Sequence, residues 1–132
     1  MQLRGVDESK EPPPAPVRVE EEARVARGPK IRCRACRSVV TDVAARVEAH
    51  GAHTHRRVNP SGVDFHVGCF EPAPGCITEG APTLYWTWFP GCAWQLALCR
   101  ACHAHLGWRF TGEQTFWGLI LDRLVEEANE GD

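Results

Sequence analysis

From Ile31 onward the chain alternates short apolar runs with clusters of turn residues. The runs at residues 64–70, 84–89, 94–99 and 108–111 are rich in aromatic and aliphatic side chains, and none is long enough to favour a helix. Runs of this length between frequent turns are typical of antiparallel strands. The pattern therefore predicts a mainly β fold.

Turn residues punctuate these runs. Residues 59–62, Asn-Pro-Ser-Gly, place Asn, Pro and Gly at positions i, i+1 and i+3 of a type I turn. The prolines and glycines between positions 72 and 82 predict a long loop. Helix is expected only at residues 42–49, as two turns, whereas residues 119–128 fit a strand or a helix.

Composition divides the chain into three parts. Its 132 residues, 43% of them hydrophobic, suit a single domain. Residues 1–30 are rich in Pro and Glu and lack aromatic side chains, so we expect a disordered tail there. The folded domain is predicted to span residues 31–125, followed by a flexible C-terminal tail at 126–132.

Charge and hydropathy exclude two classes of partner. The formal net charge is −2, and no block of Lys and Arg provides the basic footprint of a nucleic-acid binder. No apolar run approaches the roughly 20 residues of a membrane span, and the N-terminus does not resemble a signal peptide. We therefore expect a cytoplasmic protein, with reduced thiols, that binds neither nucleic acid nor membrane.

The cysteine spacing predicts one metal site. Cys33-x-x-Cys36 and Cys99-x-x-Cys102 each place two thiolates on one side of an ion, and four sulfurs favour tetrahedral Zn²⁺. Four protein ligands leave no open position for water, so the zinc is expected to be structural. Redox chemistry at either C-x-x-C pair is the alternative, but it is typical of βαβ surroundings that this sequence lacks.

The other three cysteines have no partner at ligand spacing. We interpret Cys69, Cys76 and Cys92 as buried core residues. In the alternative interpretation Cys69, with His66 three positions away, is a catalytic nucleophile.

Two His-x-His pairs, His53 with His55 and His103 with His105, would present two imidazoles on one face of a strand. They are candidates for a second metal site, although such histidines are more often ordinary strand or loop residues.

Tryptophan carries the functional signal. Trp88, Trp94 and Trp108 fall within 21 residues, and Trp86 would share a strand face with Trp88 if residues 84–89 are extended. Five indoles in so short a chain are hard to bury completely. Composition alone leaves two interpretations open, an aromatic core or an aromatic cage for a flat neutral ring or a quaternary ammonium.

The order of these motifs resembles that of the CULT domain family, which includes a thalidomide-binding domain and small bacterial single-domain proteins. The match covers about residues 31–123. It consists of Cys33-x-x-Cys36, Asn59-Pro60-x-Gly62, Trp88-Phe89-Pro90-Gly91-x-Ala93-Trp94, Cys99-x-x-Cys102, His105-Leu106-Gly107-Trp108-x-Phe110 and Phe116-Trp117-Gly118-Leu119.

The resemblance implies two antiparallel sheets that meet at an angle, the β-tent, with one structural zinc on the four paired cysteines. It also implies a ligand pocket. The indoles of Trp88, Trp94 and Trp108 form three walls, Phe110 forms the base, the main chain of Trp86 and Trp88 pairs with the polar edge of the ligand, and Asn59 and Pro60 lie at the mouth. Cys92 stands where many relatives have Tyr.

By the same resemblance the ligand is a cyclic imide of the glutarimide or thalidomide type, or a uracil-like ring. It can be carried on the cyclised C-terminus of a damaged protein. Binding rather than catalysis is expected, and this chain has no room for the ubiquitin-ligase adaptor regions of larger members. Two alternatives remain: an enzyme like methionine sulfoxide reductase B, and a cage that recognises a methylated cation.

Overall fold

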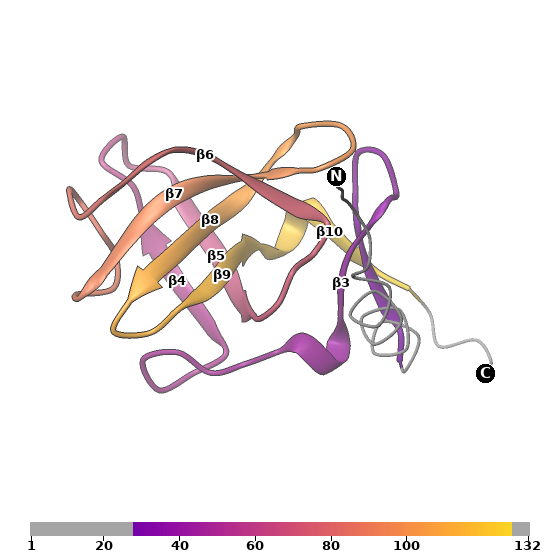
Figure 1. Ribbon diagram of the computed structural model, residues 1–132, viewed down its shortest axis with the longest axis horizontal. Coiled ribbons are helices and arrows are strands. Elements are labelled where there is room, and N and C mark those ends of the chain that lie inside the picture. The colour runs from indigo at the N-terminus through magenta and orange to yellow at the C-terminus, as the bar shows by residue number, and fades with distance from the viewer. Residues whose placement is uncertain (1–27, 128–132) are drawn as a thin grey trace, which may run out of the picture.

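Two antiparallel sheets make up the domain in the computed structural model, which describes residues 28–127 (Figure 1). The larger sheet has the order β4-β5-β9-β8-β7-β6. Its strands are β4 (Thr54–Val58), β5 (Asp64–Phe70), β6 (Cys76–Thr83), β7 (Cys92–Cys99), β8 (His105–Gly112) and β9 (Phe116–Ile120).

The smaller sheet has the order β10-β2-β3 and lies across one end of the larger one (Figure 1). It contains β2 (Lys30–Cys33), β3 (Val39–Asp42) and β10 (Leu124–Glu126). Two 3-10 turns, η2 (Val43–Ala45) and η3 (Leu121–Arg123), are the only helical segments between residues 28 and 127, and neither could cross a membrane. The mainly β class with two antiparallel sheets is confirmed.

The strands begin and end close to the limits of the predicted domain. β2 starts at Lys30 and β10 ends at Glu126. The predicted tails at 1–30 and 126–132 lie outside the described residues except for positions 28–30 and 126–127.

Three of the four predicted strands are confirmed. The run at 64–70 is β5, and the runs at 94–99 and 108–111 lie within β7 and β8. The prediction for residues 84–89 is wrong, because this segment is the turn between β6 and β7: the Thr87 N–H bonds the Leu84 carbonyl at 3.1 Å, and Trp86 has φ 56°. A left-handed residue cannot continue an extended strand.

The loop predicted between residues 72 and 82 is too long, since β6 already begins at Cys76. β6 lies at the edge of the sheet, where a proline such as Pro82 is tolerated because no further strand needs its missing N–H. The pairing of β6 with β7 shifts register between Glu79 and Thr83. The turn at 59–62 is confirmed by a 2.9 Å bond from the Gly62 N–H to the Asn59 carbonyl.

The prediction of two helical turns at 42–49 is wrong, since only the three residues of η2 are helical there. The chain after it pairs with β5 instead: Arg46 forms a bridge with Phe70, and the Val47 N–H bonds the Cys69 carbonyl at 3.0 Å. Tertiary strand pairing therefore overrides a weak local helix preference. Within the ambiguous segment 119–128, residues 119–126 belong to β9, η3 and β10, and position 128 lies outside the described residues.

Buried side chains form two clusters, one under each end of the molecule. The first surrounds Cys33, Cys99, Leu106 and Phe70 near the junction of the two sheets. The second is aromatic and joins strands of the larger sheet. Its members are Ala49, Val67, Cys69, Phe89, Cys92, Trp108, Phe110, Phe116 and Ile120.

Candidate functional site: a four-cysteine cluster and an aromatic pocket

The four paired cysteines converge at one end of the domain. Their ligand atoms all lie within 4.8 Å of one another. Cys33 and Cys102 have Sγ atoms 3.8 Å apart, and those of Cys36 and Cys99 are 3.7 Å apart. The hairpins that carry the two pairs lie side by side where the sheets meet (Figure 1). This cluster could therefore hold one metal ion.

Both C-x-x-C turns have the same backbone geometry. The N–H of Arg37 bonds the carbonyl of Cys33, and the N–H of His103 bonds the carbonyl of Cys99, each at 2.8 Å. Arg37 and His103 have φ values of 67° and 66°, so each turn ends on a left-handed residue. The two halves of the cluster are thus built locally, by turns that aim both thiols in one direction.

The thiols have unequal affinities for protons. Burial opposes ionisation of Cys99, but backbone N–H groups of Cys102 and Ala101 and the Ser38 hydroxyl lower its pKa to about 6. The Ala104 N–H favours the Cys102 thiolate, yet burial and the three neighbouring sulfurs raise its pKa to about 12. Adjacent thiolates repel one another, so a cation is needed for all four to ionise together.

An aromatic pocket of about 520 Å³ lies on the larger sheet. All seven residues predicted for the ligand site line it: Asn59, Pro60, Trp86, Trp88, Trp94, Trp108 and Phe110. Four further residues complete the lining: Phe65, Tyr85, Leu96 and His105. The structure thus brings the predicted residues together, while their binding of a ligand stays a prediction.

Strand register explains how the walls meet. Trp94 on β7 pairs with Phe110 on β8, and Leu96 pairs with Trp108, so these four side chains share one face of the sheet. Trp108 also pairs with Gly118 on β9, where a Cβ atom would lie 2.9 Å from the Phe110 ring. The missing side chain leaves room for Phe110 at the base of the pocket.

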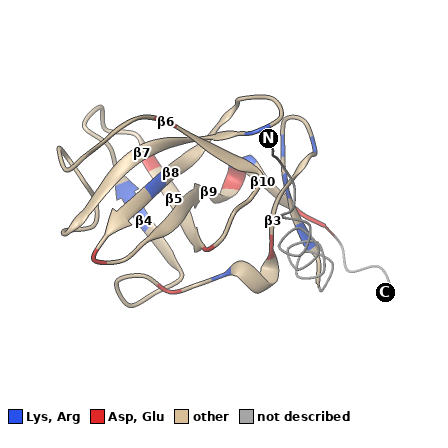
Figure 2. Cartoon of the chain, in the orientation of Figure 1, with Lys and Arg blue, Asp and Glu red and all other residues tan. Residues whose placement is uncertain are grey.

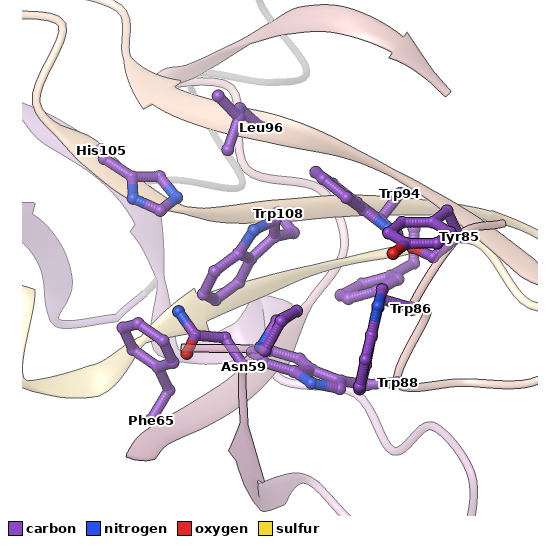
Figure 3. A pocket seen from close by; sticks show the side chains of 11 residues that line it. Asn59, Phe65, Tyr85, Trp86, Trp88, Trp94, Leu96, His105 and Trp108 are labelled. Atoms are coloured by element: carbon purple, nitrogen blue, oxygen red, sulfur yellow. The ribbon is translucent and has the colours of Figure 1, made fainter. Parts of the chain in front are cut away.

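Neighbouring walls stand nearly at right angles (Figure 3). The rings of Trp88 and Trp108 have centroids 4.7 Å apart and an interplanar angle of 72°. Trp108 is only 9% exposed, whereas Trp86 is 56% exposed and stands at the rim. Ring faces inclined steeply to one another are suited to enclosing a flat, small group.

Two wall indoles are fixed by hydrogen bonds to the backbone. Trp88 Nε1 donates to the Val58 carbonyl at 3.0 Å, and Trp94 Nε1 donates to the Tyr85 carbonyl at 2.7 Å. These bonds use the polar edge of each indole and leave its apolar face toward the pocket. The prediction that Trp86 and Trp88 share a strand face is wrong, because the left-handed conformation of Trp86 turns the chain between them.

Sequence reasoning missed four lining residues. Leu96 follows Trp94 by two positions, so strand alternation after Trp94 was a usable signal. Phe65 lies on β5, and no local pattern in the sequence shows that this strand reaches the pocket. Tyr85 lies in the turn at residues 84–89, for which the sequence predicted a strand. His105 belongs to a His-x-His pair and to a motif of the family resemblance, but neither pattern predicted that it lines the pocket.

The three other cysteines are buried, as predicted. Desolvation raises the pKa of Cys69 to about 11 and that of Cys76 to about 12. Burial therefore disfavours the Cys69 thiolate that a catalytic role would need.

Three of the four histidines in the His-x-His pairs bond backbone carbonyls. His53 bonds the Val47 carbonyl at 3.0 Å, His55 bonds the Ala49 carbonyl at 2.8 Å, and His105 bonds the Gly107 carbonyl at 2.9 Å. Within residues 28–127 the four-cysteine cluster is the only group of three or more side chains that could hold a metal ion. A second metal site on these histidines is not supported.

Charges are scattered over the described elements. Figure 2 shows Lys and Arg at separate points on the strands and hairpins, with acidic residues among them. Four salt bridges join described residues, including Arg109 with Glu71 at 2.6 Å. None of the eleven pocket-lining residues is acidic.

These features define a class: an all-β domain with a four-cysteine cluster at one end and an aromatic pocket on its larger sheet. Comparison with known proteins agrees with this description. The chain is 37% identical over 84 residues to cereblon from Xenopus tropicalis, 36% over 81 residues to that from Gallus gallus, and 33% over 81 residues to that from Danio rerio. No family model matches the chain.

Each of these alignments covers 57% of this chain but only 18–19% of the relative. The chain thus spans about a fifth of the length of the cereblon proteins that it matches. Over the aligned segment the chain is similar to cereblon, which agrees with its resemblance to the CULT domain family.

Proposed function

We propose that this domain is a zinc-stabilised binding module whose aromatic pocket takes a cyclic imide or a uracil-like ring. The ring can be free or carried on the C-terminus of a damaged protein. The observation that carries the proposal is the convergence of all seven predicted residues on one pocket. The module binds its ligand and does not transform it.

The geometry of the sulfur cluster supports zinc. A tetrahedral ion with Zn–S distances of about 2.3 Å has sulfur–sulfur edges of about 3.8 Å. The Sγ separations of 3.8 Å for Cys33 with Cys102 and 3.7 Å for Cys36 with Cys99 fit those edges. All four positions are filled by protein sulfur, so the ion would clamp the two hairpins together and leave no site for substrate.

The polar groups around the pocket support a ring with an imide edge. The indole N–H groups of Trp88 and Trp94 already bond backbone carbonyls. Among the described residues, the main-chain N–H and C=O groups of Trp86 and Trp88 take part in no hydrogen bond. An imide presents an acceptor, a donor and an acceptor in a row, which such main-chain groups match, while its methylenes pack against the indoles.

The two alternatives are less well supported. A reductase of the methionine sulfoxide type needs a nucleophilic cysteine on a late strand, and the sequence has no cysteine after Cys102. A cage for a methylated cation gains from an acidic residue, and the lining of this pocket has none. A neutral ring fits the pocket best.

Tryptophan fluorescence tests the proposal, because the walls themselves are the reporters. We expect saturable quenching of the zinc-loaded protein by glutarimide or by uridine, and its loss in Trp94→Ala. Trp117→Phe is the matched control, since Trp117 lies outside the pocket lining and stacks on Arg109 at 4.6 Å. Unchanged fluorescence with both ligands in folded, zinc-loaded protein, confirmed by calorimetry, would refute ring binding.

A further inference from the structure

The pocket continues beyond the three indole walls. Figure 3 shows Trp108 near its middle, with Trp94, Tyr85 and Trp86 to one side of it and Phe65 and His105 to the other. The volume of about 520 Å³ falls in the range of roughly 300–1,000 Å³ typical of sites for drug-sized ligands. A single six-membered ring would leave part of this space unfilled. The end lined by Phe65, Leu96 and His105 is here called the far subsite.

The far subsite is mostly apolar. Phe65 and His105 stand edge-on to Trp108, with ring centroids 5.2 Å and 5.0 Å away. His105 Nε2 bonds the Gly107 carbonyl at 2.9 Å, which leaves Nδ1 as the other polar atom of the ring. Burial lowers the pKa of His105, so its imidazole is neutral at neutral pH.

A cation stands next to this subsite. Arg123, in η3, places its guanidinium carbon 5.9 Å from the centroid of the Phe65 ring. Its Nη1 atom donates to the His105 carbonyl at 2.9 Å and lies 3.4 Å from His105 Nδ1. These contacts hold the guanidinium beside the imidazole.

The charge of Arg123 is available to a ligand. No salt bridge to this residue is found among residues 28–127, and within that range its side-chain hydrogen bonds use Nη1 alone. A guanidinium has five N–H donors, so several remain. Asp64, which precedes Phe65 on β5, forms an ion pair with Arg56 and not with Arg123. The distance from Arg56 Nη1 to Asp64 Oδ2 is 3.8 Å.

We propose that the far subsite accepts an anionic substituent, such as a carboxylate arm, on the ring that the indole walls hold, and that Arg123 recognises it. The inference rests on the proposed function and narrows its ligand class: the preferred ligand is an imide or uracil-like ring with an acidic arm. Phe65 and Leu96 pack the methylenes of the arm, and the guanidinium pairs with the carboxylate at the exposed end.

Calorimetric titration of the full chain, zinc-loaded, tests the subsite. The probes are unsubstituted glutarimide, glutarimides with carboxylate arms of increasing length, and the matching carboxamides. At low ionic strength we expect the best carboxylate to bind about fivefold more tightly than its carboxamide, an advantage that salt reduces. Arg123→Gln should abolish the advantage and leave the affinity for unsubstituted glutarimide unchanged. Arg37→Gln removes the same charge from the β2–β3 hairpin, outside the pocket lining, and should preserve it.

Failure of this inference differs from failure of the proposed function. Suppose that unsubstituted glutarimide binds, but that no carboxylate binds more tightly than its carboxamide or that the tighter binding survives Arg123→Gln. The far subsite is then refuted and ring binding stands. If glutarimide does not bind but a carboxylate does so through Arg123, ring binding is refuted and the inference in this form falls with it. If no probe binds, both proposals are overturned.

Discussion

The two ends of the domain are held together in different ways. At the sulfur end, Cys33 and Cys99 are fully buried, and each is positioned by a turn that closes within five residues. At the pocket end, the rings come from β5, β7, β8 and two connecting turns, and Trp86 and Tyr85 remain 56% and 73% exposed. The sulfur end is built from local turns, whereas the pocket end is assembled from segments that are distant in the sequence.

This difference has a consequence for sequence change. A ligand cysteine at the sulfur end has no substitute, because a tetrahedral site needs all four. The rim of the pocket tolerates change, since its backbone groups do not depend on the side chain that stands there. Trp86 occupies such a position. Cys92 does not, because it is fully buried outside the pocket lining, and the turn before it is closed by a 2.9 Å bond from its N–H to the Phe89 carbonyl.

The largest effect should follow removal of one metal ligand. Cys99→Ser is expected to remove most of the folding free energy that the ion supplies, on the order of 10 kcal/mol, and the distant pocket should be lost with it. Metal analysis and circular dichroism measure both. Cys76→Ala is the matched control, since Cys76 pairs in register with Cys99 but lies outside the cluster. Loss of bound metal in the control would show that a fifth cysteine is needed.

A smaller effect should follow a substitution that alters the pocket end and leaves the sulfur end intact. Gly118→Ala adds a Cβ atom 2.9 Å from the Phe110 ring, which packs against Phe89 and Phe116 and lines the pocket, so the ring must shift and change the base of the pocket. We expect a loss of about 1–3 kcal/mol in unfolding free energy and weaker glutarimide binding, with one metal ion still bound. Denaturant unfolding and metal analysis check this. Adding Phe110→Leu should recover part of the stability, and no recovery would contradict the packing explanation.

A weaker effect concerns His105, whose protonation should make the unfolding free energy depend on pH. Desolvation lowers its pKa below the usual 6.5 in the folded protein, so the unfolded chain binds the proton more readily. Its contribution to stability is therefore present above pH 6.5 and is lost as the pH falls through and below that value. Denaturant unfolding from about pH 7.5 to about pH 5.5 should show a smaller decrease for His105→Gln than for the parent. Equal decreases in both proteins would exclude His105 as the cause.

The smallest effect concerns the turn that follows the second cysteine pair. His103 has φ 66°, a conformation that glycine adopts without strain but that costs glycine more chain entropy. His103→Gly should therefore change the unfolding free energy by less than about 1 kcal/mol in either direction, with metal binding intact. His103→Val should destabilise the turn by about 1–2 kcal/mol, because a β-branched residue resists this conformation. Thermal melts that rank the two variants the other way would contradict this explanation.

Local patterns predicted part of the fold well. The apolar run at 64–70 coincides with β5, and the Asn59–Gly62 turn forms as its residue types require. The helix at 42–49 and the strand at 84–89 failed for a shared reason. In both places the structure is set by a feature that short-range propensity does not contain. At 42–49 this feature is pairing with β5, and at 84–89 it is the left-handed backbone of Trp86.

The sequence by itself determined the two halves of the sulfur cluster, because each C-x-x-C turn with its hydrogen bond is defined within a few residues. The fold then brings the two halves within 4.8 Å of each other. It also indicated, through the order of its motifs, which residues belong to the pocket. Only the tertiary structure decided the shape of that pocket, since register between β7 and β8 sets which rings share a face. It also brought Phe65, His105 and Arg123 to one end of the pocket, because contacts across strands have no signature in the spacing of residues along the chain.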